Sequence, residues 1–113
     1  MSTISNPKFQ VYKSGSEFRY RLKARNGEII LSGEGYTSKQ NCINGINSVK
    51  NNASYESRYD RRTATNGQYY FVLKASNGEI IGVSETYTTT TARENGIEAV
   101  KRETPSAPIE DLT

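Results

Sequence analysis

A run of alternating cations is the sequence feature best suited to chemistry: Arg19, Arg21, Lys23 and Arg25. Alternate residues of a β-strand point to the same face of a sheet, so these side chains predict a basic stripe on one face. Tyr70 and Lys74 occupy equivalent positions in a segment 51 residues later. Cations beside an aromatic ring are typical of surfaces that bind single-stranded nucleic acid. The alternative is a solvated strand face whose charges oppose edge pairing.

Two carboxylates, Glu34 and Glu85, precede tyrosines at equivalent places, and a pseudo-twofold axis would bring them together for acid–base or glycoside chemistry. A carboxylate near the start of a helix more often serves the helix dipole. The chain has no histidine, which removes the commonest general base at neutral pH and the commonest metal ligand. We therefore expect no catalytic residue, no metal site and no cofactor, and we rank a small enzyme using Glu34 and Glu85 last.

The chain consists of two similar copies, 51 residues apart. Between Phe18 and Lys50, 16 of 33 positions are identical to their counterparts in the second copy, which indicates an internal duplication. Two units are too few for a solenoid, and a unit of about 50 residues buries too little surface to be stable alone. We therefore expect a single domain over residues 1–113, with repeat 1 at about 8–52, repeat 2 at about 55–102 and a tail at 103–113.

Each copy begins with strands. Apolar residues alternate with polar ones before Asn26-Gly27 and again before Asn77-Gly78. Asn-Gly between apolar runs predicts a hairpin in which both residues take the positive φ of a type I′ turn. An earlier strand and turn precede each hairpin, so each copy is expected to open as a three-stranded meander.

A helical pattern follows each meander. One stripe of the first helix consists of Cys42, Ile46, Val49 and Ala53. Ser38, with Thr37 before it, and the Thr91–Glu94 capping box are candidate helix starts. Gly45 and Gly96 each cost a helix about 1 kcal/mol relative to alanine, so we expect each helix to lie very close to another element there, most simply the sheet. The lone Cys42 is expected to be a small buried side chain.

These motifs resemble a known family. Leu-Lys-Ala-x-Asn-Gly-Glu-Ile-Ile, Glu-x-Tyr-Thr and Asn-Gly-Ile-x-x-Val-Lys recur as in the YegP-like family of small bacterial tandem-repeat proteins, whose function is unknown. The longer Ser-Glu-x-Tyr form is intact at Ser84–Tyr87, whereas Gly33 and Gly35 replace it in the first copy. The resemblance covers about Phe9 to Lys101 and the final Asp-Leu-Thr. It implies an α+β fold of strand-strand-strand-helix-strand units sharing one antiparallel sheet, with helices on one face. The last strand of each unit would be exchanged onto the other, residues 55–63 being the first. The family brings no established activity, cofactor or catalytic residue.

Charge is unevenly divided between the two halves. Eight Lys/Arg and three Glu give residues 1–51 a charge of +5, and seven Lys/Arg and nine Asp/Glu give residues 52–113 a charge of −2. We expect a non-enzymatic binding or accessory protein whose basic sheet face takes nucleic acid, another anionic ligand or an acidic protein. The alternative is a structural or self-associating protein with no small ligand. The expected state is a monomer or a weak homo-oligomer. No segment is apolar enough to span a membrane, and the N-terminus lacks the pattern of a secretory signal, so we expect no membrane partner and a cytoplasmic location.

Overall fold

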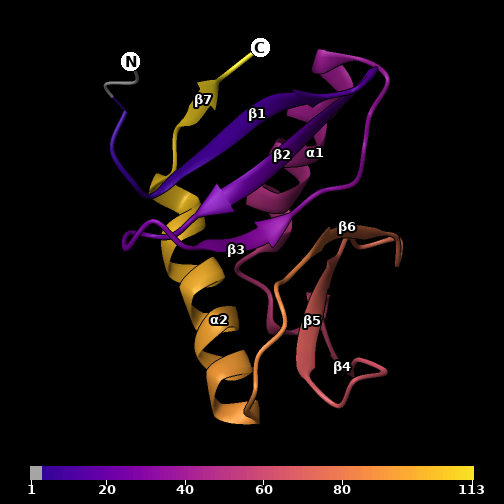
Figure 1. Ribbon diagram of the computed structural model, residues 1–113, viewed down its shortest axis with the longest axis vertical. Coiled ribbons are helices and arrows are strands. Elements are labelled where there is room, and N and C mark those ends of the chain that lie inside the picture. The colour runs from indigo at the N-terminus through magenta and orange to yellow at the C-terminus, as the bar shows by residue number, and fades with distance from the viewer. Residues whose placement is uncertain (1–3) are drawn as a thin grey trace.

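The computed structural model describes residues 4–113 and shows an α+β architecture with one mixed sheet and two helices (Figure 1). The elements within these residues are β1 (Lys8–Ser14), β2 (Glu17–Lys23), β3 (Ile29–Ser32), α1 (Lys39–Asn52), the 3-10 turn η1 (Glu56–Arg58), β4 (Tyr59–Thr63), β5 (Tyr69–Lys74), β6 (Ile80–Val83), α2 (Thr90–Glu103), the 3-10 turn η2 (Thr104–Ser106) and β7 (Ile109–Asp111). The predicted meander before each helix is confirmed. The expectation about a secretory signal rests partly on residues 1–3, which lie outside the described residues.

One sheet joins both repeats in the strand order β4-β5-β6-β3-β2-β1-β7. The strand that follows each helix lies on the other repeat, because β4 pairs with β5 and β7 pairs with β1. The expected exchange is confirmed, although η1 shortens the strand expected over residues 55–63, so that β4 starts at Tyr59. One expectation is wrong: the sheet is not wholly antiparallel, because β7 runs parallel to β1. The chain leaving η2 returns to the start of β1, where the N–H of Phe9 donates to the carbonyl of Pro108 at 2.8 Å, and both strands then run in the same direction.

A pseudo-twofold axis passes through the centre of the sheet. The repeats meet where Ser32 of β3 pairs with Val83 of β6 in antiparallel orientation. These two residues are 51 positions apart, the spacing of the duplication, so equivalent residues face each other across the axis. Each helix reaches past this axis, since α1 contacts β5 and β6 of the second repeat and α2 contacts β3 of the first.

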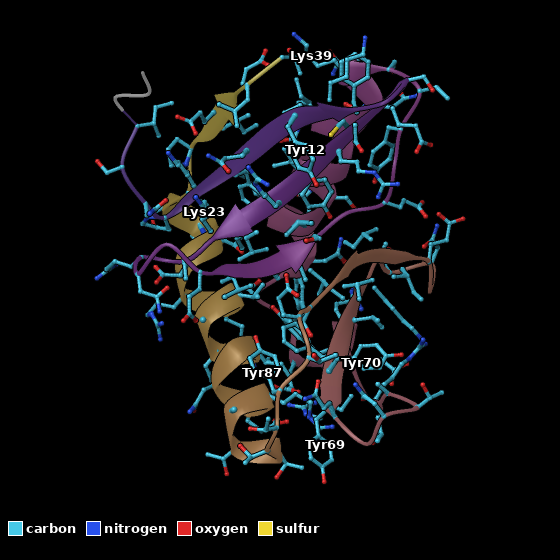
Figure 2. All side chains as sticks on the ribbon, viewed as in Figure 1. Tyr12, Lys23, Lys39, Tyr69, Tyr70 and Tyr87 are labelled. Atoms are coloured by element: carbon cyan, nitrogen blue, oxygen red, sulfur yellow. The ribbon has the colours of Figure 1, made fainter. Side chains whose placement is uncertain are left out.

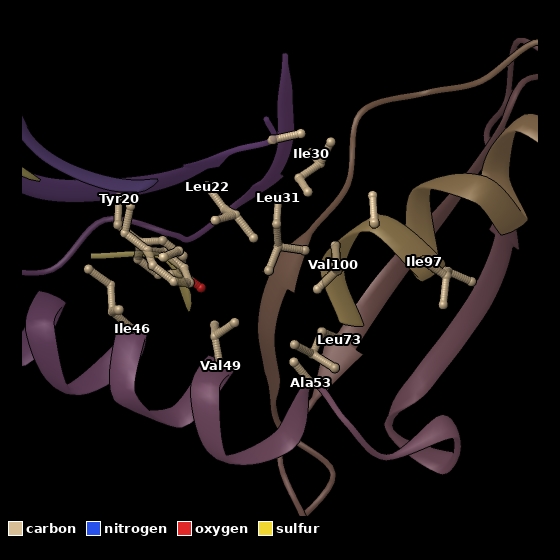
Figure 3. Close-up of a cluster of buried hydrophobic side chains, with 14 of the residues drawn as sticks. Tyr20, Leu22, Ile30, Leu31, Ile46, Val49, Ala53, Leu73, Ile97 and Val100 are labelled. Atoms are coloured by element: carbon tan, nitrogen blue, oxygen red, sulfur yellow. The ribbon is translucent and has the colours of Figure 1, made fainter. Parts of the chain in front are cut away.

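Side chains of both repeats form one buried hydrophobic cluster (Figure 3). Its centre is made by four fully buried residues from the two repeats, Leu31, Val49, Leu73 and Val100. Burying a side chain of this size stabilises a fold by about 1.5–3 kcal/mol. The repeats are also joined by a hydrogen bond from the hydroxyl of Tyr20 to the carbonyl of Ile81. Each repeat therefore covers apolar surface that belongs to the other.

The Asn-Gly hairpins are confirmed, but their turn type is not the expected one. Among residues 4–113, positive φ occurs only at glycines, and Gly27 and Gly78 each have a φ of +87°. Asn26 and Asn77 do not take positive φ, so the type I′ assignment is wrong. These hairpins use the alternative in which a type I turn is followed by one left-handed glycine that forms a bulge.

The first hairpin shows why both residues are present. The N–H of Gly27 donates to the carbonyl of Ala24 at 2.8 Å, which closes the turn. The side-chain oxygen of Asn26 accepts the N–H of Glu28 at 3.0 Å. Asparagine therefore stabilises the turn through its side chain, and glycine supplies the backbone conformation.

Both helices begin at a capping side chain. The hydroxyl of Ser38 accepts the backbone N–H three residues later at 3.1 Å, as expected for α1. In α2 the cap is Thr89, whose hydroxyl accepts the equivalent N–H at 3.0 Å. The capping box expected at Thr91–Glu94 is wrong, because the helix has already begun at Thr90. No helix of residues 4–113 is long and apolar enough to cross a membrane.

Gly45 and Gly96 lie against tyrosine rings. A Cβ atom at Gly45 would lie 2.9 Å from Cζ of Tyr36, and one at Gly96 would lie 2.8 Å from Cζ of Tyr87. Each tyrosine comes shortly before its helix and forms a β-bridge back to the sheet. The expected close approach is confirmed, but its partner is a tyrosine side chain and not the sheet backbone.

Candidate functional site

The polar face of the sheet lies opposite the helices. In Figure 1, α1 lies behind β1 and β2, so the near face of these strands carries no helix. The register places the cations of β2 beside polar residues of β1, and β7 adds one carboxylate. We call this surface the open face; in the first repeat it consists of Lys8, Gln10, Tyr12, Glu17, Arg19, Arg21, Lys23 and Glu110.

Two carboxylates neutralise two cations of the open face. Glu110, only 4% exposed, accepts Nζ of Lys8 at 2.9 Å and Nε2 of Gln10 at 2.6 Å. These hydrogen bonds, the one from Gln10 first, lower the pKa of the Glu110 carboxyl, so it is ionised at neutral pH. Glu17 accepts a guanidinium nitrogen of Arg19 at 3.3 Å. Lys8 and Arg19 therefore have partners within the protein.

Arg21 and Lys23 are the cations in excess. None of the ion pairs formed within residues 4–113 includes either of them. Nε of Arg21 donates to Oε1 of Gln10 at 2.7 Å, and the guanidinium lies over the ring of Tyr12, 4.6 Å from its centroid. Arg21 is thus held over an aromatic ring, and no ion pair within residues 4–113 neutralises its charge.

Tyr70 and Lys74 lie on the corresponding face of β5 in the second repeat. Lys74 and Arg62 both pair with Asp60, at 3.3 and 3.0 Å. Hydrogen bonds from Arg62 and then Lys74 lower the pKa of Asp60. Tyr70 is opposite Arg62 in the β4–β5 register. This group therefore carries two cations against one carboxylate, with an aromatic ring beside them.

The two groups are separated by an uncharged strip that consists of Ser32, Val83 and Val72. The register connects Arg21 through β3 and β6 to Val72 of β5. Neighbouring strands lie about 4.8 Å apart, so Arg21 and Val72 are about 14 Å from each other. Val83, between them, is 42% exposed, whereas Val72 is buried. Figure 2 shows Tyr12 and Lys23 on the β1–β2 ribbon and Tyr70 beside β5. The structure therefore brings Arg19, Arg21 and Lys23 together and leaves Tyr70 and Lys74 in a second group.

Arg25 does not belong to the open face, and its expected place on the strand is wrong. β2 ends at Lys23, where the register with β3 shifts, and the next residue begins the turn. The backbone N–H of Arg25 donates to Glu103 of α2 at 3.4 Å, and its guanidinium lies 3.6 Å from the same carboxylate. The alternation of cations continues through the turn in sequence, but the strand does not.

Glu34 and Glu85 are not brought together, so the expected pairing of these carboxylates is wrong. Because Ser32 pairs with Val83 in antiparallel orientation, residue 34 lies beside residue 81 and residue 85 beside residue 30. Four residues along extended strands separate the two carboxylates by about 13 Å. Both side chains are exposed. Glu34 and Glu85 therefore lie on opposite sides of the pseudo-twofold axis.

Cys42 is fully buried on α1, as expected of a small core side chain. Burial raises the pKa of its thiol, which keeps it protonated at neutral pH. In the part of the chain that the structure describes, no three His, Cys, Asp or Glu side chains are grouped so that they could hold a metal ion.

Gln10, Tyr12 and Glu110 complete the open face, although the sequence did not single them out. The alternation in Phe9-Gln10-Val11-Tyr12 is a signal that Gln10 and Tyr12 share a polar face. Their position opposite β2 depends on the turn that joins β1 to β2. No local pattern indicates that β7 would place Glu110 beside Gln10.

The family described as "Domain of unknown function (DUF1508)" matches the chain twice, over residues 14–60 and 64–111. Each match runs from the second strand of a meander through the helix to the strand that follows it. The UPF0339 protein YegP of Escherichia coli K12 is 48% identical over 106 residues, which are 93% of this chain and 96% of that protein. The "UPF0339 protein in ptx operon 5'region" of Stutzerimonas stutzeri is 42% identical over 105 residues, 92% and 95% of the two chains.

Two solved structures have the same fold. The NMR structure of YegP from E. coli has a TM-score of 0.89 at 46% identity, covering 99% of this chain and 97% of that one. The NMR structure of a UPF0339 protein from Shewanella oneidensis has a TM-score of 0.88 at 45% identity, covering 94% and 91%. The protein is therefore an α+β tandem-repeat protein with two helices on one mixed sheet. It belongs to the DUF1508 family, together with the YegP-like UPF0339 proteins, and these relatives define neither a reaction nor a ligand.

Proposed function

We propose that this protein is a non-enzymatic binding protein whose open face takes single-stranded nucleic acid. The observation that carries the proposal is the state of Arg21, which lies 4.6 Å from the Tyr12 ring centroid and has no ion-pair partner within residues 4–113. A guanidinium fixed in this way offers donors to a phosphate and a flat surface to an unstacked base. Lys23 adds a second cation on the same strand that forms no ion pair within residues 4–113, although its charge also acts on Glu110.

The uncharged strip and the second group support the same reading. Val83, which Ser32 separates from the first group, presents exposed apolar surface. Tyr70, on the other side of the strip, offers a further ring, and stacking of one base on an aromatic side chain is worth about 1–3 kcal/mol. A single strand that crosses the sheet from β2 to β5 would meet charge, apolar surface and an aromatic ring in turn.

Self-association is the alternative that the uneven charge of the two halves leaves open. The edge strand β4 carries Asp60, Arg61 and Arg62, and all three are engaged in ion pairs. Charges on an edge strand oppose pairing with the edge of another copy. The proposed function therefore needs only a monomer. We also place the protein in the cytoplasm, where single-stranded nucleic acid is available to it.

The test is a salt titration with a fluorescent single-stranded oligonucleotide. Affinity should fall with salt with a log–log slope of about −0.7 per phosphate neutralised. Arg21→Ser should flatten this slope, whereas the matched control Arg19→Ser should change it less, because Arg19 is already paired with Glu17 at 3.3 Å. Tyr70→Ala should weaken binding by about 1–3 kcal/mol with little change in slope.

Two results would overturn the proposal: no binding at low salt, or binding that Arg21→Ser and Tyr70→Ala both leave unchanged. Thermal melting of each variant checks that it is folded. Light scattering over a range of protein concentrations tests the alternative, since a mass that rises with concentration without nucleic acid indicates self-association. Oligonucleotide binding that does not change with salt, and that an acidic protein displaces, would also count against nucleic acid as the partner.

A further inference from the structure

A cavity of about 550 Å³ lies on the helix side of the sheet, between the turn that joins β2 to β3 and one face of α2. Small side chains of α2 form one wall, since Ala92, Gly96 and Ala99 recur along one side of the helix. Ile30 and Tyr87 add apolar surface, and Figure 2 shows Tyr87 beside α2. This volume lies within the range of about 300–1,000 Å³ that small-molecule sites occupy.

The cavity contains a carboxylate with an unfilled acceptor. Glu103 is 2% exposed, and its Oε2 atom accepts no hydrogen bond from any residue in 4–113. Among the described residues, the only hydrogen bond to the other oxygen is the long one from the N–H of Arg25, at 3.4 Å. Buried carboxylates normally have their acceptors filled, because a buried polar atom that accepts no hydrogen bond is costly. Glu103 is also the last residue of α2, where the helix dipole disfavours a negative charge.

Two cations stand at the mouth of the cavity. The guanidinium of Arg25 lies 3.6 Å from Oε2 of Glu103, and that of Arg102 lies 3.7 Å from Oε1. Their side chains are 74% and 62% exposed, so both are free to turn toward a bound anion. Glu28 lines the cavity as well, so its charged residues are two cations and two anions.

The first repeat shows that the fold does not require these charges. Asn52 occupies the place of Glu103, and its amide donates to the carbonyl of Ser48 at 2.8 Å and accepts from Arg58 at 2.9 Å. The equivalents of Arg25 and Arg102 are Ser76 and Asn51. One copy thus has an amide whose hydrogen bonds are filled, one of them by Arg58, and the other has a carboxylate between two arginines with one oxygen that accepts no hydrogen bond.

We propose that this cavity binds a free α-amino acid with an apolar side chain. The ammonium group would take the place of the Arg25 guanidinium beside the covered Oε2 atom of Glu103, and the carboxylate would accept from the displaced Arg25 and from Arg102. In an α-amino acid the ammonium and carboxylate groups are attached to the same carbon. Their short separation matches the site, where Oε2 of Glu103 and the guanidinium of Arg25 lie 3.6 Å apart. The balanced charges of the cavity favour a zwitterion over a polyamine or a dianion. The side chain would lie against the small residues of α2.

The test is an NMR titration of the ¹⁵N-labelled full chain with L-leucine. Amide resonances of residues 24–30 and 92–103 should shift and saturate by about 10 mM ligand. Two analogues separate the sources of binding: isoamylamine keeps only the ammonium group, and 4-methylpentanoate keeps only the carboxylate. Each should bind at least about tenfold more weakly than leucine, since each lacks one ion pair.

Glu103→Gln and Arg25→Gln should each weaken leucine binding at least about tenfold. Ser76→Ala, at the position equivalent to Arg25, is the matched control and should leave affinity unchanged. Melting temperatures show whether Glu103→Gln is folded, and the exposed Arg25 provides a second variant if it is not. The proposal is overturned if leucine, alanine and phenylalanine cause no saturable shifts, if isoamylamine binds as well as leucine, or if both variants bind leucine as wild type does.

Discussion

Substitution of Gly96 by alanine tests the contact between α2 and the tyrosine that precedes it. A Cβ atom at residue 96 would lie 2.8 Å from Cζ of Tyr87 and 3.3 Å from Cε1 of Phe71. Real Cβ atoms do not approach carbon this closely, so the ring or the helix must move. Tyr87 cannot move freely, because its backbone exchanges two hydrogen bonds with Tyr69, at 2.8 and 2.6 Å.

Two opposing effects set the magnitude. Alanine in place of glycine stabilises a helix interior by about 1 kcal/mol. Overpacking a filled site costs about 1–3 kcal/mol. We therefore expect Gly96→Ala to lower the free energy of unfolding by up to about 2 kcal/mol. When Tyr87→Leu has first removed Cζ and the hydroxyl, the same substitution should instead be neutral or stabilising, by up to about 1 kcal/mol.

Urea unfolding followed by circular dichroism on the four proteins of this double-mutant cycle measures the coupling. The coupling energy between residues 87 and 96 should be at least about 1 kcal/mol, well above the additivity error of about 0.3–0.5 kcal/mol. Equal effects of Gly96→Ala in both backgrounds would refute the contact as the reason for glycine. Gly45→Ala with Tyr36→Leu provides an independent cycle in the other repeat.

Three further outcomes are expected. A chain ending at Asn52 should unfold or dimerise, because α1 loses its contacts with β5 and β6; a sharply melting monomer in ultracentrifugation would contradict this. Gly27→Val should destabilise by about 1–2 kcal/mol in urea, since a β-branched residue is strained at positive φ, and an unchanged midpoint would contradict the turn assignment. Hydrogen bonds from Thr113 and then Lys39 lower the pKa of Asp111 from 3.8 to about 2. The stability that this lowered pKa contributes is present above about pH 4 and is lost as the pH falls toward 2. The melting temperature of Asp111→Asn should therefore change less with pH over that window than that of the wild type, and identical profiles of melting temperature against pH for the two proteins would contradict this prediction.

Much of the fold could be predicted because its signals are local. The alternation before Asn26 and the stripe through Ile46 and Val49 depend only on how side chains repeat along a strand or a helix. The turn type could not be predicted, because Asn-Gly suits both a type I′ turn and a type I turn with a glycine bulge. The parallel β7 could not be predicted either, since its place depends on where η2 delivers the chain.

The candidate sites were predictable to different degrees. The strand pattern places Arg21 on the polar face, but only the register shows that Tyr12 and Gln10 hold it there. Arg25 was misplaced because a run of charges does not show where a strand ends. The cavity at Glu103 has no motif, yet comparison of the two repeats gives a signal, because the copies differ there in charge while the surrounding pattern is retained.

Three strands, which begin at Lys8, Tyr59 and Ile109, follow one another at nearly the repeat length. The described part of the chain therefore has three of these strands but two α-helices. Because β7 runs parallel to β1 with Val11 opposite Asp111, the residues after Asp111 continue alongside the end of β1. From there to Lys8 is about five extended residues, or about 16 Å, a span that a short linker covers. A circularly permuted chain, joined at this point and opened in the turn at residues 64–68, would keep every strand pairing of the sheet. The order of elements along the chain is thus only one of several that would build this arrangement.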